Sequence, residues 1–124
     1  MSKCILVVED QPDNRQILRD LLGNAGYELV EAENGVEALA AVAKRRPDLI
    51  LMDIQMPVKN GYEAALEIRS LKNGSKVPII ALTAEIMVGE KAKCLEFGMN
   101  DYISKPIIEE DLNSIINKWL PKKR

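Results

Sequence analysis

The chain has 124 residues, of which 47% are hydrophobic and 29% are charged, and its formal net charge is -2. This length suits one domain with a single core, and the charge balance gives no reason to expect direct nucleic-acid binding. The sequence has no histidine, which excludes an imidazole base, a phosphohistidine or a histidine metal ligand supplied by this chain. No apolar run is long enough to cross a bilayer, so we expect a cytoplasmic protein with no membrane insertion.

Short apolar runs alternate with segments of helical periodicity along the chain. In chain order the pattern predicts strand 3–8, helix 12–26, strand 27–32, helix 34–46, strand 48–53, helix 62–72, strand 79–83, helix 89–98, strand 101–104 and helix 109–120. Pro12 can open the first helix and Asn34 can cap the second, while Gly26 and Gly98 are typical of helix ends. Five predicted strands therefore alternate with five predicted helices.

This alternation indicates the fold class. Strands joined through helices require right-handed crossovers, and they form a parallel sheet that helices cover on both faces. The runs "KCILVV", "LILMD" and "IIALT" are apolar almost throughout, which is typical of buried parallel strands. We therefore predict an α/β fold, a doubly wound five-stranded parallel sheet flanked by five helices, in one domain spanning residues 1–124.

Polar side chains gather where the predicted strands end. Because the carboxyl ends of parallel strands share one edge of the sheet, we expect these residues to lie together: Glu9, Asp10, Asp53, Thr83, Ser104 and Lys105. Each acid alone is also compatible with a helix cap or a solvated turn. Three neighbouring carboxylates repel one another unless a cation lies among them. These carboxylates therefore either destabilise the folded protein or bind a metal ion.

The chemistry of this edge points to phosphoryl groups. Oxygen ligands without histidine or cysteine favour a hard ion, and two or three carboxylates with room for water and phosphate suit Mg²⁺. Lys105 and Thr83 supply the cation and the hydroxyl that an incoming phosphoryl group requires. A carboxylate can serve as the nucleophile.

Four motifs in this order resemble the receiver domain of two-component response regulators, including single-domain chemotaxis-type regulators. They are "VVED" at 7–10, "LILMDIQMPVKNG" at 49–61, "ALTA" at 81–84 and "YISKP" at 102–106. The resemblance covers the whole chain and implies the flavodoxin-like strand order 2-1-3-4-5. That order would place Asp10 beside Asp53.

The resemblance implies a role for each matching position. Asp53 would accept the phosphoryl group, Asp10 would bind Mg²⁺ (or Mn²⁺) directly and Glu9 mainly through water. The main-chain carbonyl of Gln55 would complete the protein's metal ligands. Lys105 would contact the phosphoryl oxygens and would be joined to Pro106 by a cis peptide bond.

The resemblance also implies how the domain would signal. Thr83 and Tyr102 would form a switch pair that alters the surface of the fourth helix, the fifth strand and the fifth helix. Gln55 and Glu85 occupy the positions that tune hydrolysis of the aspartyl phosphate. The domain would catalyse its own phosphorylation and dephosphorylation without being a conventional enzyme.

The missing histidine means that the phosphodonor must come from another molecule, a sensor histidine kinase or a histidine phosphotransfer protein. The altered surface would bind an unidentified downstream protein or a second copy of the domain. The start "MSKCIL" favours a free-standing regulator over a receiver cut from a hybrid kinase. Neither the kinase nor the target can be deduced from the sequence.

Three rival functions fit parts of the pattern. A flavodoxin-like cofactor protein needs a phosphate-cradling loop after the first strand, where this chain has the acidic "EDQPDN". A haloacid-dehalogenase-type phosphatase needs a second aspartate two residues after the nucleophile, where this chain has Gln55. A receiver-like scaffold that binds proteins without being phosphorylated would have no need of the complete set of Glu9, Asp10, Asp53, Thr83 and Lys105.

Overall fold

The computed structural model describes residues 3–56, 59–84 and 89–120. Its elements are β1 (Cys4–Val8), α1 (Pro12–Asn24), β2 (Glu28–Ala32), α2 (Gly35–Lys44), β3 (Leu49–Asp53), α3 (Gly61–Ser70), the short 3₁₀ helix η1 (Lys72–Gly74), β4 (Ile79–Thr83), α4 (Glu90–Glu96), β5 (Asp101–Ser104) and α5 (Glu109–Trp119). The predicted alternation of five strands and five helices is confirmed.

The five strands form one parallel sheet in the order β2-β1-β3-β4-β5, as the resemblance implied. Strand β3 lies at its centre, between β1 and β4. The register pairs Asp53 with Leu82 and Thr83 with Ser104, so β3, β4 and β5 end close to one another. The order therefore brings the carboxyl ends of distant strands to one edge.

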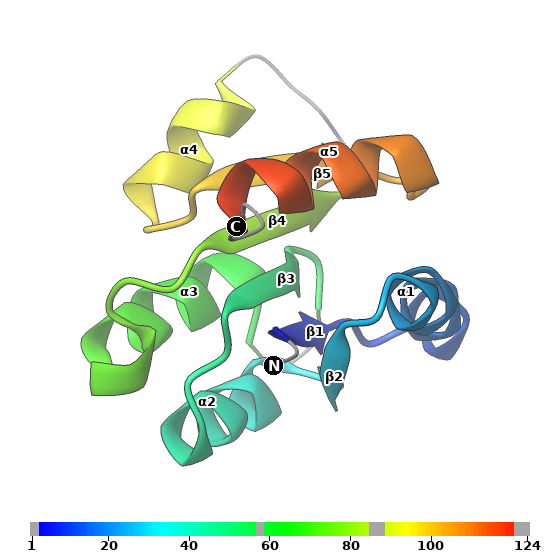
Figure 1. Ribbon diagram of the computed structural model, residues 1–124. Coiled ribbons are helices and arrows are strands. Elements are labelled where there is room, and N and C mark those ends of the chain that lie inside the picture. The colour runs from blue at the N-terminus through cyan, green and yellow to red at the C-terminus, as the bar shows by residue number, and fades with distance from the viewer. Residues whose placement is uncertain (1–2, 57–58, 85–88, 121–124) are drawn as a thin grey trace.

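Helices cover the sheet in two groups, with α2, α3 and α4 on one face and α1 and α5 on the other (Figure 1). Successive strand residues point to opposite faces, so β3 contributes Ile50 and Met52 to one core cluster and Leu49 and Leu51 to the other. All five residues of β1, β3 and β4 are buried. Burial on both faces explains why the sequence of these strands is continuously apolar.

The helix ends follow local chemistry. Pro12 is the first residue of α1, and the Asn34 side chain accepts a hydrogen bond from the Glu37 N–H at 2.9 Å. Helix α1 ends at Asn24, two residues before the predicted limit, and Gly26 follows with a φ of +88°. The longest described helix has 13 residues, and no described helix is long and apolar enough to cross a membrane.

The sequence pattern did not predict η1. Residues 71 and 72 were expected to continue α3, but Leu71 is extended and the chain turns into the 3₁₀ helix. The Arg69 guanidinium donates hydrogen bonds to the carbonyls of Gly74 and Val77 at 2.8 and 2.6 Å. These side-chain bonds hold the turn in place, and helical periodicity does not predict them.

Candidate functional site

The predicted polar residues lie at the carboxyl edge of the sheet. Asp53 is the last residue of β3 and Thr83 is the last residue of β4, and these side chains are almost fully buried, at 3% and 4% exposure. Glu9 directly follows β1 and has 0% exposure. Because uncompensated charges are rarely buried, this edge must contain compensating groups.

Three carboxylates meet at this edge. Oxygen atoms of Glu9, Asp10 and Asp53 all lie within 4.8 Å of one another. The Lys105 ammonium forms ion pairs with two of them, with its Nζ atom 2.9 Å from Glu9 and 3.3 Å from Asp53. One described cation therefore compensates part of a cluster of three acids.

The surroundings in this cluster shift the pKa values of Asp53 and Lys105. Burial, together with the nearby Glu9 charge, raises the pKa of Asp53 to about 7, although Lys105 opposes the shift. Burial acts to lower the pKa of Lys105, but contact with Glu9 and Asp53 outweighs it and the pKa is raised. An acid that resists ionisation at neutral pH marks a place where a further cation would be stabilising.

Main-chain groups orient the acidic side chains. The N–H of Gln11 donates to Glu9 Oε2 at 3.1 Å, and the N–H of Gln55 donates to Asp53 Oδ1 at 3.2 Å. The guanidinium of Arg15 donates to the carbonyl oxygens of Glu9 and Asp10 at 2.9 and 3.3 Å. Arg15 was not predicted from the sequence as a residue of the site. Its position one turn into a helix that follows the acidic pair was the available signal.

The turn after Asp53 depends on Gly61. A Cβ atom on Gly61 would lie 2.4 Å from the main-chain oxygen of Asp53, a distance that real structures do not tolerate. The Gly61 N–H donates to the Ile54 carbonyl at 2.9 Å, and Asn60 caps α3 in a capping box with Glu63. Gly61 therefore lies directly against the main chain of Asp53 and Ile54.

The β5–α5 turn completes the site. The N–H of Lys105 donates to the carbonyl of Thr83 at 2.8 Å, and the peptide bond between Lys105 and Pro106 is cis. Ser104 pairs with Thr83 in the sheet. Lys105 is thus placed by the strand pairing that ends at Thr83.

The remaining predicted residues have different surroundings. Tyr102 is half-buried against the core and pairs with Ala81, two residues before Thr83 on the same face of β4. Gln55 follows β3 and its side chain is exposed. Glu85 lies outside the described residues.

The donor set fits a magnesium ion. The three converging carboxylates present oxygen atoms only, which are the ligands that a hard divalent cation prefers. Burial and the nearby Glu9 charge raise the pKa of Asp53, so a cation beside this carboxylate would stabilise its ionised form. These residues suit a small hard cation that keeps several water ligands.

The sheet order and this carboxylate edge define an α/β protein with the flavodoxin-like receiver architecture. The model of the response regulator receiver domain family matches residues 5–117. The chain belongs to this family, whose members act in two-component phosphorelay systems.

Relatives of two kinds are similar to this chain. The chain is 42% identical over 118 residues to the sensor protein GacS of Pseudomonas syringae pv. syringae, covering 93% of this chain and only 13% of that protein. It is 41% identical over 107 residues to the polar-differentiation response regulator DivK of Brucella anthropi, covering 86% of this chain and 87% of that protein. The domain thus resembles both a part of a large sensor and nearly all of a small regulator.

Solved structures agree with the fold. The receiver domain of sensor histidine kinase PA1611 from Pseudomonas aeruginosa, solved with a magnesium ion in its active site cleft, is 40% identical, with a TM-score of 0.90. The match covers 98% of this chain and 100% of that one. The receiver domain of Saccharomyces cerevisiae Ssk1, solved with the histidine phosphotransfer protein Ypd1, is 37% identical, with a TM-score of 0.88 and coverage of 95% and 88%.

Proposed function

We propose that this domain accepts a phosphoryl group from a partner's phosphohistidine onto Asp53 in a magnesium-dependent reaction. The observation that carries the proposal is the position of Asp53, a buried carboxylate at the centre of the sheet edge between two further acids and Lys105. A carboxylate in this setting is both a nucleophile and a group that needs cations around it.

The chain's own residues supply the groups for phosphoryl transfer. An Asp53 carboxylate oxygen attacks phosphorus while the bond between phosphorus and the partner's imidazole nitrogen breaks. Lys105 already lies 3.3 Å from Asp53, so its ammonium can follow the new phosphoryl oxygens without a large movement. Thr83 is the last residue of the neighbouring strand β4, and its hydroxyl could donate a hydrogen bond to the phosphoryl group.

The metal site would use the same edge. Asp10, Asp53 and the main-chain carbonyl of Gln55 would hold Mg²⁺ or Mn²⁺ directly, and Glu9 would act mainly through water. The bound cation would neutralise negative charge on the transferring group. The magnesium ion in the cleft of the related receiver of PA1611 supports this assignment.

The donor would be a sensor histidine kinase or a histidine phosphotransfer protein. These 124 residues contain no histidine, so the phosphohistidine would lie outside this domain. The yeast receiver solved with Ypd1 and the receiver of the kinase PA1611 are the related cases that support both kinds of donor. We propose that residues 1–124 act as one receiver domain in the cytoplasm.

The output would be a change in partner binding at the surface formed by α4, β5 and α5. A hollow of about 390 Å³ lies there, lined by residues that include Lys91, Tyr102 and Ser114. Phosphorylation would draw Thr83 toward the phosphoryl group and let the Tyr102 ring move inward. The altered surface would bind a downstream protein or a second copy of the domain, and Gln55 and Glu85 would tune the return to the unphosphorylated state.

Beryllofluoride, a phosphoryl mimic, tests this proposal on the full chain. With Mg²⁺ present we expect large NMR amide shifts at Asp53 and Thr83 that extend to β5 in wild type. The matched variant Asp53→Asn should show none of these shifts. A scaffold that functions without phosphorylation would give the same spectrum with and without the mimic, and equal responses of the two proteins would refute Asp53 as the acceptor.

A further inference from the structure

Arg15 connects α1 to the acidic loop after β1. Its NH1 atom lies 2.9 Å from the Glu9 carbonyl oxygen and 3.3 Å from that of Asp10. The side chains of an α-helix tilt toward its N-terminus, so a residue in the first turn of α1 can reach back to the loop that precedes the helix. One guanidinium therefore bonds the main chain of both acidic residues.

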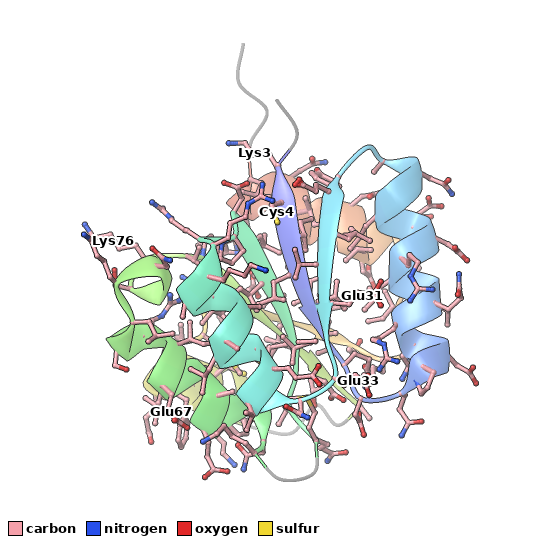
Figure 2. The ribbon with its side chains drawn as sticks, turned by 90° about the horizontal axis from the view of Figure 1, so that it is seen from below. Lys3, Cys4, Glu31, Glu33, Glu67 and Lys76 are labelled. Atoms are coloured by element: carbon pink, nitrogen blue, oxygen red, sulfur yellow. The ribbon has the colours of Figure 1, made fainter. Side chains whose placement is uncertain are left out.

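A second contact holds Arg15 from the opposite side. Its Nε atom lies 3.6 Å from the Glu31 carboxylate on β2, and Arg19 holds that carboxylate with two hydrogen bonds of 2.7 and 2.8 Å. Figure 2 shows Glu31 on the side of β2 that faces α1. The Arg15 side chain is 14% exposed, whereas that of Arg19 is 47% exposed. The less exposed Arg15 is thus held by Glu31, whose carboxylate is in turn held by Arg19.

The direction of a carboxylate depends on the main chain that bears it. When the carbonyls of Glu9 and Asp10 are both tied to Arg15, the dihedral angles on either side are restricted, and so are the Cα–Cβ directions. The Gln11 N–H then holds the Glu9 carboxylate itself. Groups that orient metal ligands in this way contribute substantially to metal affinity.

We infer that Arg15 is a positioning residue for the magnesium site, braced by Glu31 and Arg19. The inference rests on the proposed function, because it concerns the same acidic edge. It assigns to the β2–α1 contact a role in metal binding that does not involve any contact of Arg15 with the ion. Arginine is required because its planar fork can serve the loop and Glu31 together, which a lysine ammonium cannot do as well.

The sign of the effect separates positioning from simple charge. Removal of a cation near three carboxylates should strengthen Mg²⁺ binding if electrostatics alone acts. Loss of the main-chain bonds should weaken it instead, by roughly 10-fold or more. We therefore expect Arg15→Met to bind Mg²⁺ roughly 10-fold more weakly than wild type, with Arg15→Lys between the two.

The measurement is Mg²⁺ titration calorimetry on the full chain at fixed ionic strength, with the melting temperature of each variant recorded. Arg45→Met is the matched control, because Arg45 also pairs with a glutamate of β2, Glu28, at 2.8 Å but is remote from the loop. We expect its Mg²⁺ affinity to stay close to that of wild type. If Arg15→Met does not fold, Arg15→Lys serves the same purpose, because it keeps the positive charge. Weaker Mg²⁺ binding by Arg15→Lys would then reflect the lost main-chain bonds, and unchanged binding would overturn the positioning role.

Binding by Arg15→Met that equals or exceeds that of wild type would overturn the positioning role. If wild type binds Mg²⁺ and is phosphorylated on Asp53, that result overturns this inference alone. If wild type itself fails to bind Mg²⁺, the proposed function and the inference fail together.

Discussion

The Lys105 ammonium lies 2.9 Å from the Glu9 carboxylate, although the two residues follow strands that are not neighbours in the sheet. Lys105 follows β5 and Glu9 follows β1, with β4 and β3 between them. The lysine side chain therefore reaches across the edge and contacts Asp53 on the way, at 3.3 Å. This contact holds the acidic cluster together before any other cation binds.

Replacement of Lys105 should separate stability from metal binding. Lys105→Met leaves Glu9 and Asp53 buried without their cation, so we expect a loss of about 2 kcal/mol in unfolding free energy in metal-free buffer at pH 8. Because a competing cation is removed, Mg²⁺ should bind more tightly to this variant while phosphorylation becomes slower. Chemical denaturation and calorimetry measure the two effects, with Lys105→Arg as the variant that keeps the charge. Weaker Mg²⁺ binding by Lys105→Met would contradict this expectation.

The stability of the metal-free protein should depend on pH through Asp53. Its pKa rises from 3.8 to about 7 on folding, so the folded state holds its proton more tightly than the unfolded state does. Protonation of Asp53 therefore favours the folded state. This contribution to stability is fully present below pH 3.8 and is lost as the pH rises through about 7.

Asp53→Asn removes this dependence. We expect it to be more stable than wild type by about 2 kcal/mol at pH 8 in metal-free buffer, with the difference shrinking toward pH 4. Added Mg²⁺ should narrow the gap at pH 8 by stabilising wild type more than the variant. Melting curves across this pH range measure the difference in stability. A difference that does not vary with pH would show that it does not arise from ionisation of Asp53.

Two glycines allow a matched test of the turn behind Asp53. Gly61→Ala would place a methyl group 2.4 Å from the Asp53 carbonyl oxygen, and we expect a loss of about 3 kcal/mol together with weaker Mg²⁺ binding. Gly23 lies within α1, and a Cβ there would have nothing within 4 Å. Gly23→Ala should therefore stabilise the protein by about 0.5 kcal/mol. Equal melting temperatures for the two variants would show that the space beside Gly61 can accommodate a methyl group.

Arg69 should contribute to the stability of the fold and have no effect on Mg²⁺ affinity. Its guanidinium donates to the carbonyls of Gly74, Val77 and Gly98 and to the Asn100 side chain, and burial lowers its pKa. We expect Arg69→Met to lose about 3 kcal/mol of stability, because four acceptors lose their donor.

The control for Arg69 is again Arg45→Met, which removes an exposed ion pair and should cost less than about 1 kcal/mol. Denaturant titration gives both values, and the Mg²⁺ affinity of folded Arg69→Met should match that of wild type. A marked fall in that affinity would place Arg69 in the site after all.

The sequence could predict the elements that depend on short-range patterns. Continuous apolar runs located the strands, and Pro12 and Asn34 marked helix starts because their effects are local. The position of Asp53 at a strand end was also readable, since parallel strands share one carboxyl edge. The strand order, by contrast, came from a resemblance between motifs.

Long-range contacts could not be read in the same way. Nothing in the spacing of Arg15 and Glu31 reveals that they meet, because their contact depends on how α1 packs beside β2. The 3₁₀ helix η1 is held by Arg69, and Gly61 lies against the main chain of Asp53, eight residues earlier in the chain. Such interactions act across the tertiary structure, where local periodicity carries no information.

Intact-mass spectrometry can detect the phosphoryl group that we expect on Asp53. Wild type incubated with Mg²⁺ and acetyl phosphate should gain the mass of one phosphoryl group, and reduction with borohydride should convert Asp53 to an alcohol that peptide mapping locates. The gain should be absent when Mg²⁺ is chelated and in Asp53→Asn. A phosphoryl group on another residue, or an equal gain in Asp53→Asn, would show that Asp53 is not the acceptor.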